Sequence, residues 1–418
     1  MKNIHKSIRL GLGMLIVAAS ASSVADIKIG VLLPLTGPLS SLGNDVNRGF
    51  ELARDMANEK GGVNGEKIVF ATSDVPGSNE AASQATRLIT RDSVQVIVGS
   101  YASSISFAAS QVAERNGVIY VEQGAVADDI TKRGFKNLFR FIYPATELGR
   151  GGAQYATDII LPKLNIPLKN ARVAIMNEDS SYGTAVAEGA KKWLQDKGVQ
   201  VVDTASYSYK TTDLSSVVQR FKSAKPDIVI ACSYTPDGIL FWRQAREAKL
   251  ELKALIGNGG AHNIPDFAEA LGDDVNGLFN AGTSAYFNPK GLSPEAAQLF
   301  KEFHSAYEKK FQRKPSAHSA MGFNAMWVLL SEILPAAGGT DPEKVRAAFL
   351  ALDKPVGSTI VGWGLKFDPQ TGNNTRAFPM IDQWQERQIR TIYPPEFGVT
   401  SNITMPLPEW GKRADVGK

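Results

Sequence analysis

The stretch VQVIVGSYASSISFAASQVAERNG, residues 94 to 117, decides the fold of this chain. It begins with a short run rich in valine and isoleucine, residues 94–98, which is typical of a buried strand. Gly99 ends that run. A helix is expected over residues 104–115, because the apolar residues there recur at helical spacing. A buried strand followed at once by such a helix is the repeating unit of a parallel α/β sheet.

The turn between this strand and this helix, residues 100–104, has the composition of an anion site. Tyr101, Ser103 and Ser104 carry hydroxyl groups, and a helix N-terminus presents unpaired N–H groups and a partial positive charge. Together these groups predict a socket for a carboxylate or a similar anion. The alternative interpretation is that Ser103 simply caps the helix, since serine is a common N-cap residue.

The first 25 residues have the pattern of a secretory signal peptide. Lys2, Lys6 and Arg9 form a basic start, and residues 10–19 are an apolar core that is too short to span a bilayer as a stable anchor. The residues before Asp26 fit the small-x-small cleavage rule, and no cysteine lies near them. We therefore expect an exported protein without a lipid anchor, whose mature chain begins at about Asp26.

Composition and charge are those of an ordinary globular protein. The chain has 418 residues, of which 43% are hydrophobic, and this length suits two or more domains. Its 46 basic and 42 acidic residues give a net charge of +4, and loss of the signal peptide leaves 43 against 42, or +1. A nearly neutral mature chain gives no sign of nucleic-acid binding. The single cysteine, Cys232, lies in an apolar run, which favours a buried structural residue over a catalytic thiol.

Strand and helix patterns alternate in two consecutive runs along the chain, which predicts two parallel sheets with helices on both faces. In the first run we expect strands at 27–33, 67–72, 94–98 and 118–122, and helices at 45–60, 79–91 and 104–115. In the second run we expect strands at 171–177, 199–207, 227–232 and 253–257, and helices at 182–197, 213–224 and 237–248. The intervening segment 139–149 interrupts the alternation.

The last third of the chain has a different pattern. Helices are expected at 294–314, 317–334 and 341–352, followed by short strands within 359–393. Residues 367–374, FDPQTGNN, indicate a hairpin turn. The proline-rich segment 394–418 is expected to run over the surface as an extended tail.

The segments that follow the predicted strands are the candidate binding loops, since doubly wound sheets bind ligands outside the carboxyl ends of their strands. These segments are 36–43, 100–104, 123–126, 178–182, 233–235 and 258–263. They are rich in hydroxyl groups, small residues and backbone amides, and poor in acid–base pairs, which suits binding without chemical transformation. The sequence lacks a Walker-type glycine loop, an HExxH pair and a G-x-S-x-G elbow, so we expect no enzyme activity, cofactor or metal.

Three histidines remain in the mature chain. Only His262 falls on a loop after a strand, where it either lines a pocket or is a simple loop residue. His304 lies on a charged helix and is expected to face solvent, whereas His318 begins an apolar helix and is expected to be structural.

Seven motifs, spread over nearly all of the mature chain, form an ordered set. They are IKIGVLLPLTGPLSSLG, NEKGGVNGEKI, VIVGSYASSISFAAS, GAVADDITKRGF, NEDSSYG, SYTPDGILFWRQAREAKL and LIGNGGAHN. Each motif is weak alone, but the ordered set is specific. A chain with this set resembles the type I periplasmic solute-binding proteins of ABC transporters, in the branched-chain amino-acid (Leu/Ile/Val-binding) family.

The resemblance implies an α/β fold of two doubly wound parallel-sheet lobes joined by three crossover strands. The crossings fall near Phe141, Gly282 and Thr359. The N-terminal lobe then comprises residues 26–141 plus 282–358, and the C-terminal lobe residues 142–281 plus 359–393. Residues 1–25 form the signal peptide, and residues 394–418 form the tail. In such proteins a ligand closes the cleft between the lobes.

The resemblance also implies a ligand site. The serine that meets the ligand carboxylate falls on Ser103, and the second-lobe aromatic positions fall on Tyr182 and Tyr234. The full set of expected ligand-binding residues is Leu42, Tyr101, Ser103, Ser104, Gly124, Ala125, Val126, Tyr182, Tyr234, Asn258, Gly259 and His262.

Two residues that hold the ligand amino group in the family are missing. The family's threonine falls on Val126, and its glutamate falls at about Gly259. A buried ammonium without an acceptor is strongly unfavourable. Either another acid substitutes, with Asp179 and Glu122 as candidates, or the ligand has no α-amino group. We hypothesise a small carboxylate or amide ligand, which includes aromatic acids.

The expected function is that of a periplasmic receptor which captures a small carboxylate and delivers it to the membrane permease of an ABC importer, with the receptor itself a monomer. The alternatives are an exported sensor that feeds a chemoreceptor or regulator, and an exported hydrolase. The missing catalytic motifs argue against the hydrolase. A neighbouring gene for a permease would separate the importer from the sensor.

Overall fold

The computed structural model describes residues 26–416, so the expected signal peptide lies outside the described residues. The first sheet has five strands, all parallel. They are β1 (Ile27–Leu33), β2 (Ile68–Asp74), β3 (Val96–Gly99), β4 (Ile119–Glu122) and β5 (Leu138–Arg140). Their order across the sheet is β2-β1-β3-β4-β5. Strand β1 is paired on both sides, with Gly30 opposite Ala71 of β2 and Ile97 of β3.

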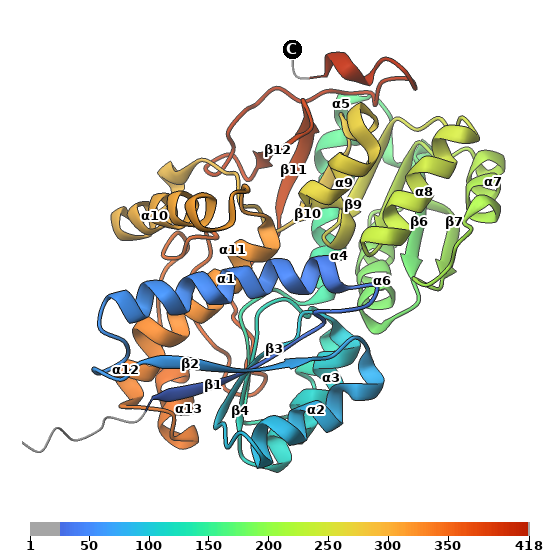
Figure 1. Ribbon diagram of the computed structural model, residues 1–418. Helices are drawn as coiled ribbons and strands as arrows, with labels where there is room; N and C mark the ends of the chain where they lie inside the picture. The colour runs from blue at the N-terminus through green and yellow to red at the C-terminus, as the bar shows by residue number, and fades with distance from the viewer. Residues whose placement is uncertain (1–25, 417–418) are drawn as a thin grey trace, which may run out of the picture.

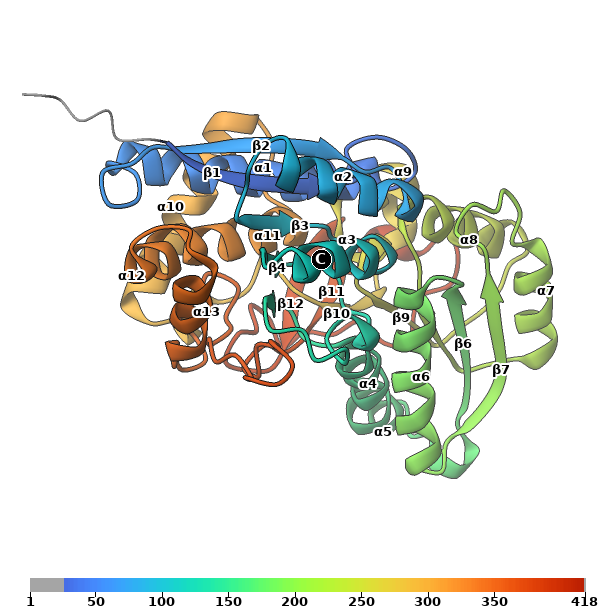
Figure 2. The same ribbon diagram turned by 90° about the horizontal axis from the view of Figure 1, so that it is seen from below.

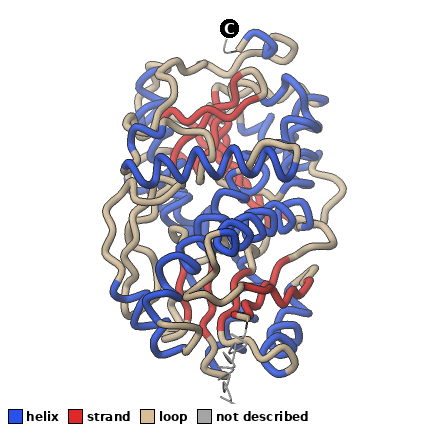
Figure 3. The backbone as a smooth tube through the Cα atoms, turned by 60° about the vertical axis from the view of Figure 1, so that its left-hand side comes forward, coloured by secondary structure: helices blue, strands red, loops and turns tan. Residues whose placement is uncertain are grey.

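The second sheet has seven strands. They are β6 (Arg172–Glu178), β7 (Gln200–Tyr207), β8 (Ile228–Cys232), β9 (Ala254–Asn258), β10 (Phe279–Gly282), β11 (Met380–Gln385) and β12 (Gln388–Tyr393). Their order is β12-β11-β10-β9-β8-β6-β7. Strand β11 pairs antiparallel with both β10 and β12, and the other pairs are parallel. Figure 3 shows the strands in two separate groups, one toward each end of the molecule.

Helices cover both sheets (Figure 1). Those near the first sheet are α1 (Ser40–Glu59), α2 (Ser78–Thr90), α3 (Ser103–Arg115), α10 (Pro294–Phe311), α11 (Ala317–Val328), α12 (Leu334–Ala337) and α13 (Pro342–Ala351). Those near the second sheet are α4 (Ala145–Tyr155), α5 (Leu161–Lys163), α6 (Ser181–Asp196), α7 (Ser215–Ala224), α8 (Thr235–Glu247) and α9 (Pro265–Leu271). In Figure 2, α6 and α7 lie on opposite sides of β6 and β7, as a doubly wound sheet requires.

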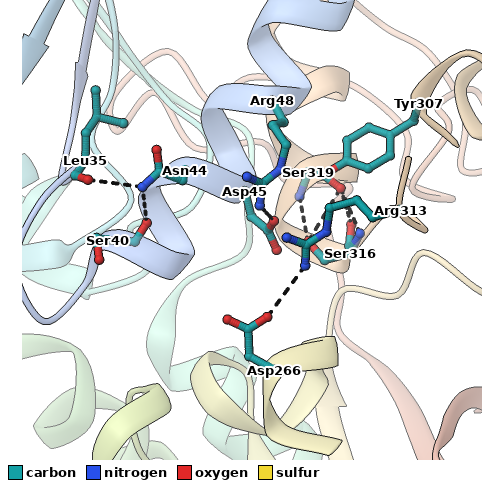
Figure 4. A network of polar contacts seen from close by, with 10 residues as sticks. All are labelled: Leu35, Ser40, Asn44, Asp45, Arg48, Asp266, Tyr307, Arg313, Ser316 and Ser319. Carbon is teal, nitrogen blue, oxygen red and sulfur yellow. Dashed lines mark hydrogen bonds and ion pairs between the residues drawn. The ribbon is translucent and has the colours of Figure 1, made fainter. Parts of the chain in front are cut away.

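The predicted α/β fold class is confirmed, and most predicted elements agree with the structure to within a few residues. One difference is α1, which begins at Ser40 rather than at Asp45. The side chain of Asn44 donates hydrogen bonds to the carbonyl oxygens of Leu35 (3.0 Å) and Ser40 (2.7 Å), which holds the first turn against the preceding loop. Figure 4 shows these contacts.

The segment 139–149, predicted as an interruption, contains the end of β5 and the start of α4. Helix α4 is rich in glycine, which is why its sequence does not read as a helix. The glycines permit a close helix crossing. A Cβ atom at Gly149 would lie 1.9 Å from the carbonyl oxygen of Val186 in α6, and one at Gly189 would lie 2.4 Å from that of Thr146. Strand β10 and helix α9 are likewise absent from the predicted elements.

The chain passes between the two sheets three times, at residues 141–144, 283–293 and 352–379. The predicted hairpin turn is present, with Phe367 bridged to Asn374. It lies against the edge of the first sheet. The N–H of Arg140 donates to the carbonyl of Gly372, and the N–H of Asn374 donates to the carbonyl of Arg140, both at 2.8 Å.

The tail docks on the second-sheet side of the molecule. The N–H of Leu407 donates to the carbonyl of Lys253 (2.7 Å), and the guanidinium of Arg413 lies 3.6 Å from the ring centre of Trp410. Elsewhere, the run Ala317–Ala337 is long and apolar enough to cross a membrane by length and composition, yet 72% of its most apolar window is buried inside the structure.

Candidate functional site

A cavity of about 30 Å³ lies between the carboxyl ends of the first sheet and those of the second. Its lining comes from both sheets and from the segments that pass between them. The lining residues are Tyr101, Ser103, Gly124, Val126, Ile142, Tyr143, Leu148, Tyr182, Tyr234, Gly259, Gly260, Asn263, Thr283, His318 and Met321. A volume of this size holds about two water molecules. The lining residues of the first sheet and those of the second sheet are therefore nearly in contact.

Seven of the twelve sequence-predicted site residues belong to the lining of this cavity. They are Tyr101, Ser103, Gly124, Val126, Tyr182, Tyr234 and Gly259. The other five lie outside the lining. Leu42 is buried in α1, Ala125 is buried behind Gly124, and Ser104 is half-buried on α3. Asn258 and His262 are buried in the second sheet and its following turn.

Ser103 is the first residue of α3 and does not cap it. The N-cap position is Ala102, and no side chain caps this helix, so the capping interpretation of Ser103 is wrong. The Ser103 Oγ instead accepts a hydrogen bond from the N–H of Ala127 (3.1 Å). The hydroxyl proton of Ser103 therefore remains available to donate into the cavity. Helix geometry also leaves the Ser103 N–H without an intrahelical acceptor.

The Glu122 carboxylate accepts hydrogen bonds from four backbone N–H groups around the predicted anion socket. Its side chain is 0% exposed. Oε2 accepts from the N–H of Ser100 (2.7 Å), and Oε1 accepts from the N–H groups of Tyr101 (3.3 Å), Gly124 (2.8 Å) and Ala125 (2.7 Å). Burial raises the pKa of the Glu122 carboxyl, and these amide bonds oppose that rise. The chain's own carboxylate thus fills this part of the predicted socket, whereas the hydroxyl proton of Ser103 is not engaged by it.

His318 forms part of the wall, which its predicted structural role did not anticipate. The Tyr101 hydroxyl and the His318 Nε2 are 2.9 Å apart, and their rings meet edge to face. Burial lowers the pKa of His318 to about 4, so the ring is neutral at pH 7. No local pattern could have joined these residues, since 217 positions separate them in the chain.

Gly259 adopts a backbone conformation that explains the missing glutamate. Its φ is +67° and its ψ is −150°, a region that residues with a side chain rarely enter. The following Gly260 also has a positive φ, and a Cβ atom there would lie 3.0 Å from the Tyr182 hydroxyl. That hydroxyl donates to the carbonyl of Asn258 (2.5 Å). A glutamate at residue 259 would require a different turn.

Neither acid proposed as a substitute for that glutamate lies on the cavity wall. Asp179 is exposed, and Glu122 is fully engaged by backbone amides. The described residues that line the cavity include no Asp, Glu, Lys or Arg. The site therefore offers hydroxyl groups, amides and aromatic rings to a ligand, and no ionised partner for an ammonium group.

Aromatic rings form the second-sheet wall. The rings of Tyr182 and Tyr234 lie 5.2 Å apart, and Tyr209 meets Tyr234 edge to face at 5.5 Å. Beneath them, Cys232 is 1% exposed, as the sequence favours, and burial raises the pKa of its thiol well above the usual value.

His262 and His304 occupy apolar surroundings. His262 is 3% exposed, packs against Phe267 and Gly257, and does not reach the cavity, which makes it a packing residue. The expectation that His304 faces solvent is wrong. Its ring lies 4.4 Å from that of Phe300, and burial lowers its pKa to about 4. The apolar face of α10 outweighs the charges around this histidine.

Asp237 is a buried carboxyl beside this wall, and it makes stability depend on pH. It accepts a hydrogen bond from the Tyr207 hydroxyl (2.8 Å), and burial raises its pKa to about 8. The folded protein keeps this proton up to about pH 8, whereas the unfolded chain loses it near pH 4. The unfolded state thus binds fewer protons across this window, and stability falls as pH rises.

We therefore expect the Asp237→Asn variant to lack part of this pH dependence. Between pH 6 and pH 8 the native protein should lose roughly 2 kcal/mol of unfolding free energy relative to the variant. Urea unfolding at several pH values measures this difference, and the comparison cancels the contribution of the histidines. Parallel curves for the two proteins would show that Asp237 is ionised in the folded state.

Comparisons with known proteins agree with this architecture. A family model described as periplasmic binding protein matches residues 26–381. The Leu/Ile/Val-binding protein homolog 7 of Brucella suis biovar 1 (strain 1330) is 39% identical over 396 residues, covering 94% of this chain and 97% of that protein. The crystal structure of a leucine-binding protein LivK from Thermotoga maritima MSB8 is 26% identical, with a TM-score of 0.75, and covers 87% of this chain and 97% of that one.

A solute-binding protein of an ABC transporter from R. palustris, crystallised in complex with benzoate, has the same fold. Its TM-score is 0.74 at 21% identity, and the match covers 88% of this chain and 95% of that one.

Proposed function

Because this chain belongs to the periplasmic binding proteins of the Leu/Ile/Val-binding family, we propose that it is the solute receptor of an ABC importer. It captures a small carboxylate-bearing solute in the cavity between the two sheets and hands it to the permease in the membrane. The family membership and the position of the cavity at the carboxyl ends of both sheets support this role. The chain acts after export to the periplasm, as a monomer that performs no chemical step.

The lobes of the receptor follow the three passages of the chain. The N-terminal lobe comprises residues 26–141 with 282–358, and the C-terminal lobe comprises residues 142–281 with 359–393. The hairpin of residues 367–374 reaches back to β5 across this division. A ligand that touches Ser103 in one lobe and Tyr182 in the other favours the closed arrangement, because it contacts both walls only when they approach.

The ligand is a carboxylate or amide without an α-ammonium group. One observation carries this: Ser103 offers a free hydroxyl proton at a helix N-terminus, in a cavity whose described lining contains no acidic side chain. A helix start and a hydroxyl donor stabilise an anion, whereas an ammonium would be buried without a counter-charge. The facing tyrosines suit an aromatic or aliphatic body.

A titration panel tests this ligand class. Calorimetry with benzoate, other aromatic acids, short aliphatic acids, and leucine and valine should give binding to acids without an α-amino group. Mass spectrometry of material that co-purifies with the protein would identify the natural solute. Micromolar binding of leucine or valine, with no response to the other acids, would overturn the proposal.

Ser103→Ala should weaken binding of a carboxylate. The variant loses one hydrogen bond to a charged group, worth roughly 1.5–3 kcal/mol. This corresponds to an affinity about 10- to 150-fold lower. The matched control is Ser104→Ala, because Ser104 is the next residue on α3 and lies outside the cavity lining. Equal affinities for both variants would mean that the helix start is not the anion site.

A further inference from the structure

A positive charge is buried behind the ligand site, on the last residue of β5. Arg140 is 0% exposed and does not belong to the lining of the cavity between the sheets. Within residues 26–416, its guanidinium donates hydrogen bonds to neutral oxygens. They are Asn373 Oδ1 (2.9 Å), Thr131 Oγ1 (3.3 Å) and the carbonyl oxygens of Ala125 (3.5 Å), Val126 (2.8 Å) and Ala127 (2.8 Å). Buried charges are normally paired with an opposite charge, so this arrangement is unusual.

The acids nearest to this charge are engaged elsewhere. Burial lowers the pKa of Arg140 to about 10, against the attraction of Asp128, Glu122 and Asp129. The guanidinium is therefore positively charged at pH 7. Asp128 accepts two hydrogen bonds from Thr146, Glu122 accepts four from backbone N–H groups, and Asp129 is exposed. These carboxylates thus compensate the charge of Arg140 only from a distance.

One peptide group connects Arg140 to Ser103. The carbonyl of Val126 accepts a hydrogen bond from Arg140 Nη1 (2.8 Å) and another from the N–H of Ala145, at the start of α4 (2.7 Å). The N–H of the same peptide group belongs to Ala127 and donates to Ser103 Oγ (3.1 Å). The two ends of a peptide group are coupled by resonance through its C–N bond. The contacts therefore form a continuous chain from the guanidinium to the serine hydroxyl.

All the hydrogen bonds of this chain run in the same direction. A donor at the Val126 carbonyl polarises the peptide group, which makes the Ala127 N–H a stronger donor to the Ser103 hydroxyl. Such cooperative strengthening is estimated at about 10–30% per bond. The hydroxyl proton of Ser103 is the last donor of the chain, and Ser103 lies in the cavity lining. An anionic acceptor gains most from a donor of this kind.

We propose that Arg140 is a positioning residue for the ligand carboxylate, which it does not touch: through the peptide group of residues 126 and 127, it orients and strengthens the Ser103 hydroxyl. This deepens the proposed function and rests on it. The buried guanidinium also offsets the repulsion between the ligand carboxylate and the carboxylate of Glu122.

The chain of contacts favours a carboxylate over the matching amide. A full negative charge at Ser103 is attracted by the guanidinium even across the intervening peptide group, because the surroundings are buried and screen the charge weakly. A neutral amide gains only from the stronger hydroxyl donor. Arg140 therefore acts as a specificity determinant of the anion site.

A thiol in place of the Ser103 hydroxyl tests the chain of contacts without any ligand. Ser103→Cys turns the last donor into a group that becomes an anion when it ionises. The ¹³Cβ resonance of labelled cysteine reports the pKa of this thiol, and the buried, protonated Cys232 supplies a constant reference signal. We expect the thiol pKa to be higher by about one pH unit or more in Ser103→Cys/Arg140→Gln than in Ser103→Cys alone. An unchanged pKa would overturn the proposal.

Arg133 is the matched control. Its guanidinium also donates to backbone carbonyls, those of Ile130 and Phe107, and to the hydroxyl of Ser110 (2.7 Å), but not to residues 126 and 127. In Ser103→Cys/Arg133→Gln the thiol pKa should stay within about 0.3 of its value in Ser103→Cys. Equal rises in the two double variants would show a general effect of lost charge and would overturn the proposal.

A reciprocal measurement needs only the single variant, so it holds even if Arg140→Gln does not fold. As the thiol of Ser103→Cys ionises, the guanidinium ¹⁵N resonances of Arg140 should shift with the same midpoint pH. Those of Arg133 should not follow this titration. Arg140 resonances that ignore the thiol would refute the connection between the two groups.

Pairs of an acid and its primary amide test the effect on the ligand, with benzoate and benzamide as the first pair and the other acids of the titration panel after them. In Arg140→Gln we expect the affinity for the acid to fall about ten-fold or more, and that for the amide to change within about two-fold. Arg140→Lys keeps the positive charge and should restore part of the affinity for the acid. Equal losses for acid and amide would reduce Arg140 to a structural role and overturn the proposal.

The outcomes separate this proposal from the proposed function. If acids bind in a Ser103-dependent way but Arg140→Gln affects acid and amide alike, only the role of Arg140 fails. If no acid binds, the proposed ligand class fails, and the thiol titration still decides whether Arg140 acts on residue 103.

Discussion

Glu122→Gln is expected to lower the free energy of unfolding by roughly 3 kcal/mol or more. The carboxylate accepts four backbone N–H groups from two separate turns of the first sheet. A glutamine amide replaces one acceptor oxygen by an NH₂ group, which faces N–H donors and cannot pair with them. At least one buried amide is left without an acceptor, and the turns that carry Tyr101 and Gly124 lose their common anchor.

Urea unfolding followed by circular dichroism measures this loss. The matched control is Glu114→Gln on the adjoining helix α3, because Glu114 also accepts two backbone N–H groups but is only half-buried. Water can replace its hydrogen bonds, so we expect a loss of about 1 kcal/mol or less there. Similar losses for the two variants would show that the Ser100 and Gly124 turns do not depend on the buried carboxylate.

Gly149→Ala is expected to be about as damaging, for a steric reason. The new methyl group would lie 1.9 Å from the carbonyl oxygen of Val186 and 2.9 Å from the N–H nitrogen of Ala190. Both contacts are with helix backbone, so α4 and α6 must separate rather than let a side chain swing away. Overpacking of this kind lowers stability by roughly 1–3 kcal/mol, and a backbone clash belongs at the upper end or above it.

The effect should extend to binding, because α4 carries Leu148 and α6 carries Tyr182, which both line the cavity between the sheets. Thermal unfolding and calorimetric titration of the variant measure the two losses. Gly398→Ala is the control, since its methyl would lie 3.4 Å from the nearest atom, and we expect a change below about 0.5 kcal/mol. An unchanged melting temperature for Gly149→Ala would mean that the helix crossing is looser than the structure shows.

The alternation of strands and helices was predictable because the inner strands are short apolar runs buried on both faces, whereas the helices bury one apolar face. The same logic placed Ser103 and Tyr182 at carboxyl ends of strands, where the cavity lies. Helix α4 was missed because its glycines serve contact between helices, a tertiary requirement that contradicts local propensity. The helix propensity of a segment depends on its own residues and carries no information about contacts with a distant helix.

The missed part of the cavity wall has a similar cause. His318, Thr283 and Asn263 come from segments with no binding signal of their own, and only the packing of the two sheets brings them together. The role of Glu122 was also invisible, because a carboxylate at the end of a strand looks the same whether it meets a ligand or its own backbone amides. Conversely, Leu42 was displaced from the wall by the early start of α1.

The burial of Cys232 has a practical consequence. It is the only cysteine in the whole sequence, and its inaccessible, protonated sulfur is a poor target for maleimides. Cysteines introduced at exposed Thr86 on α2 and exposed Ser223 on α7 would therefore be the sole reactive thiols, with no need to remove the native one. A donor and an acceptor fluorophore attached there would report the distance between α2 and α7 by energy transfer, one molecule at a time, and so test whether that distance shortens as solute is added.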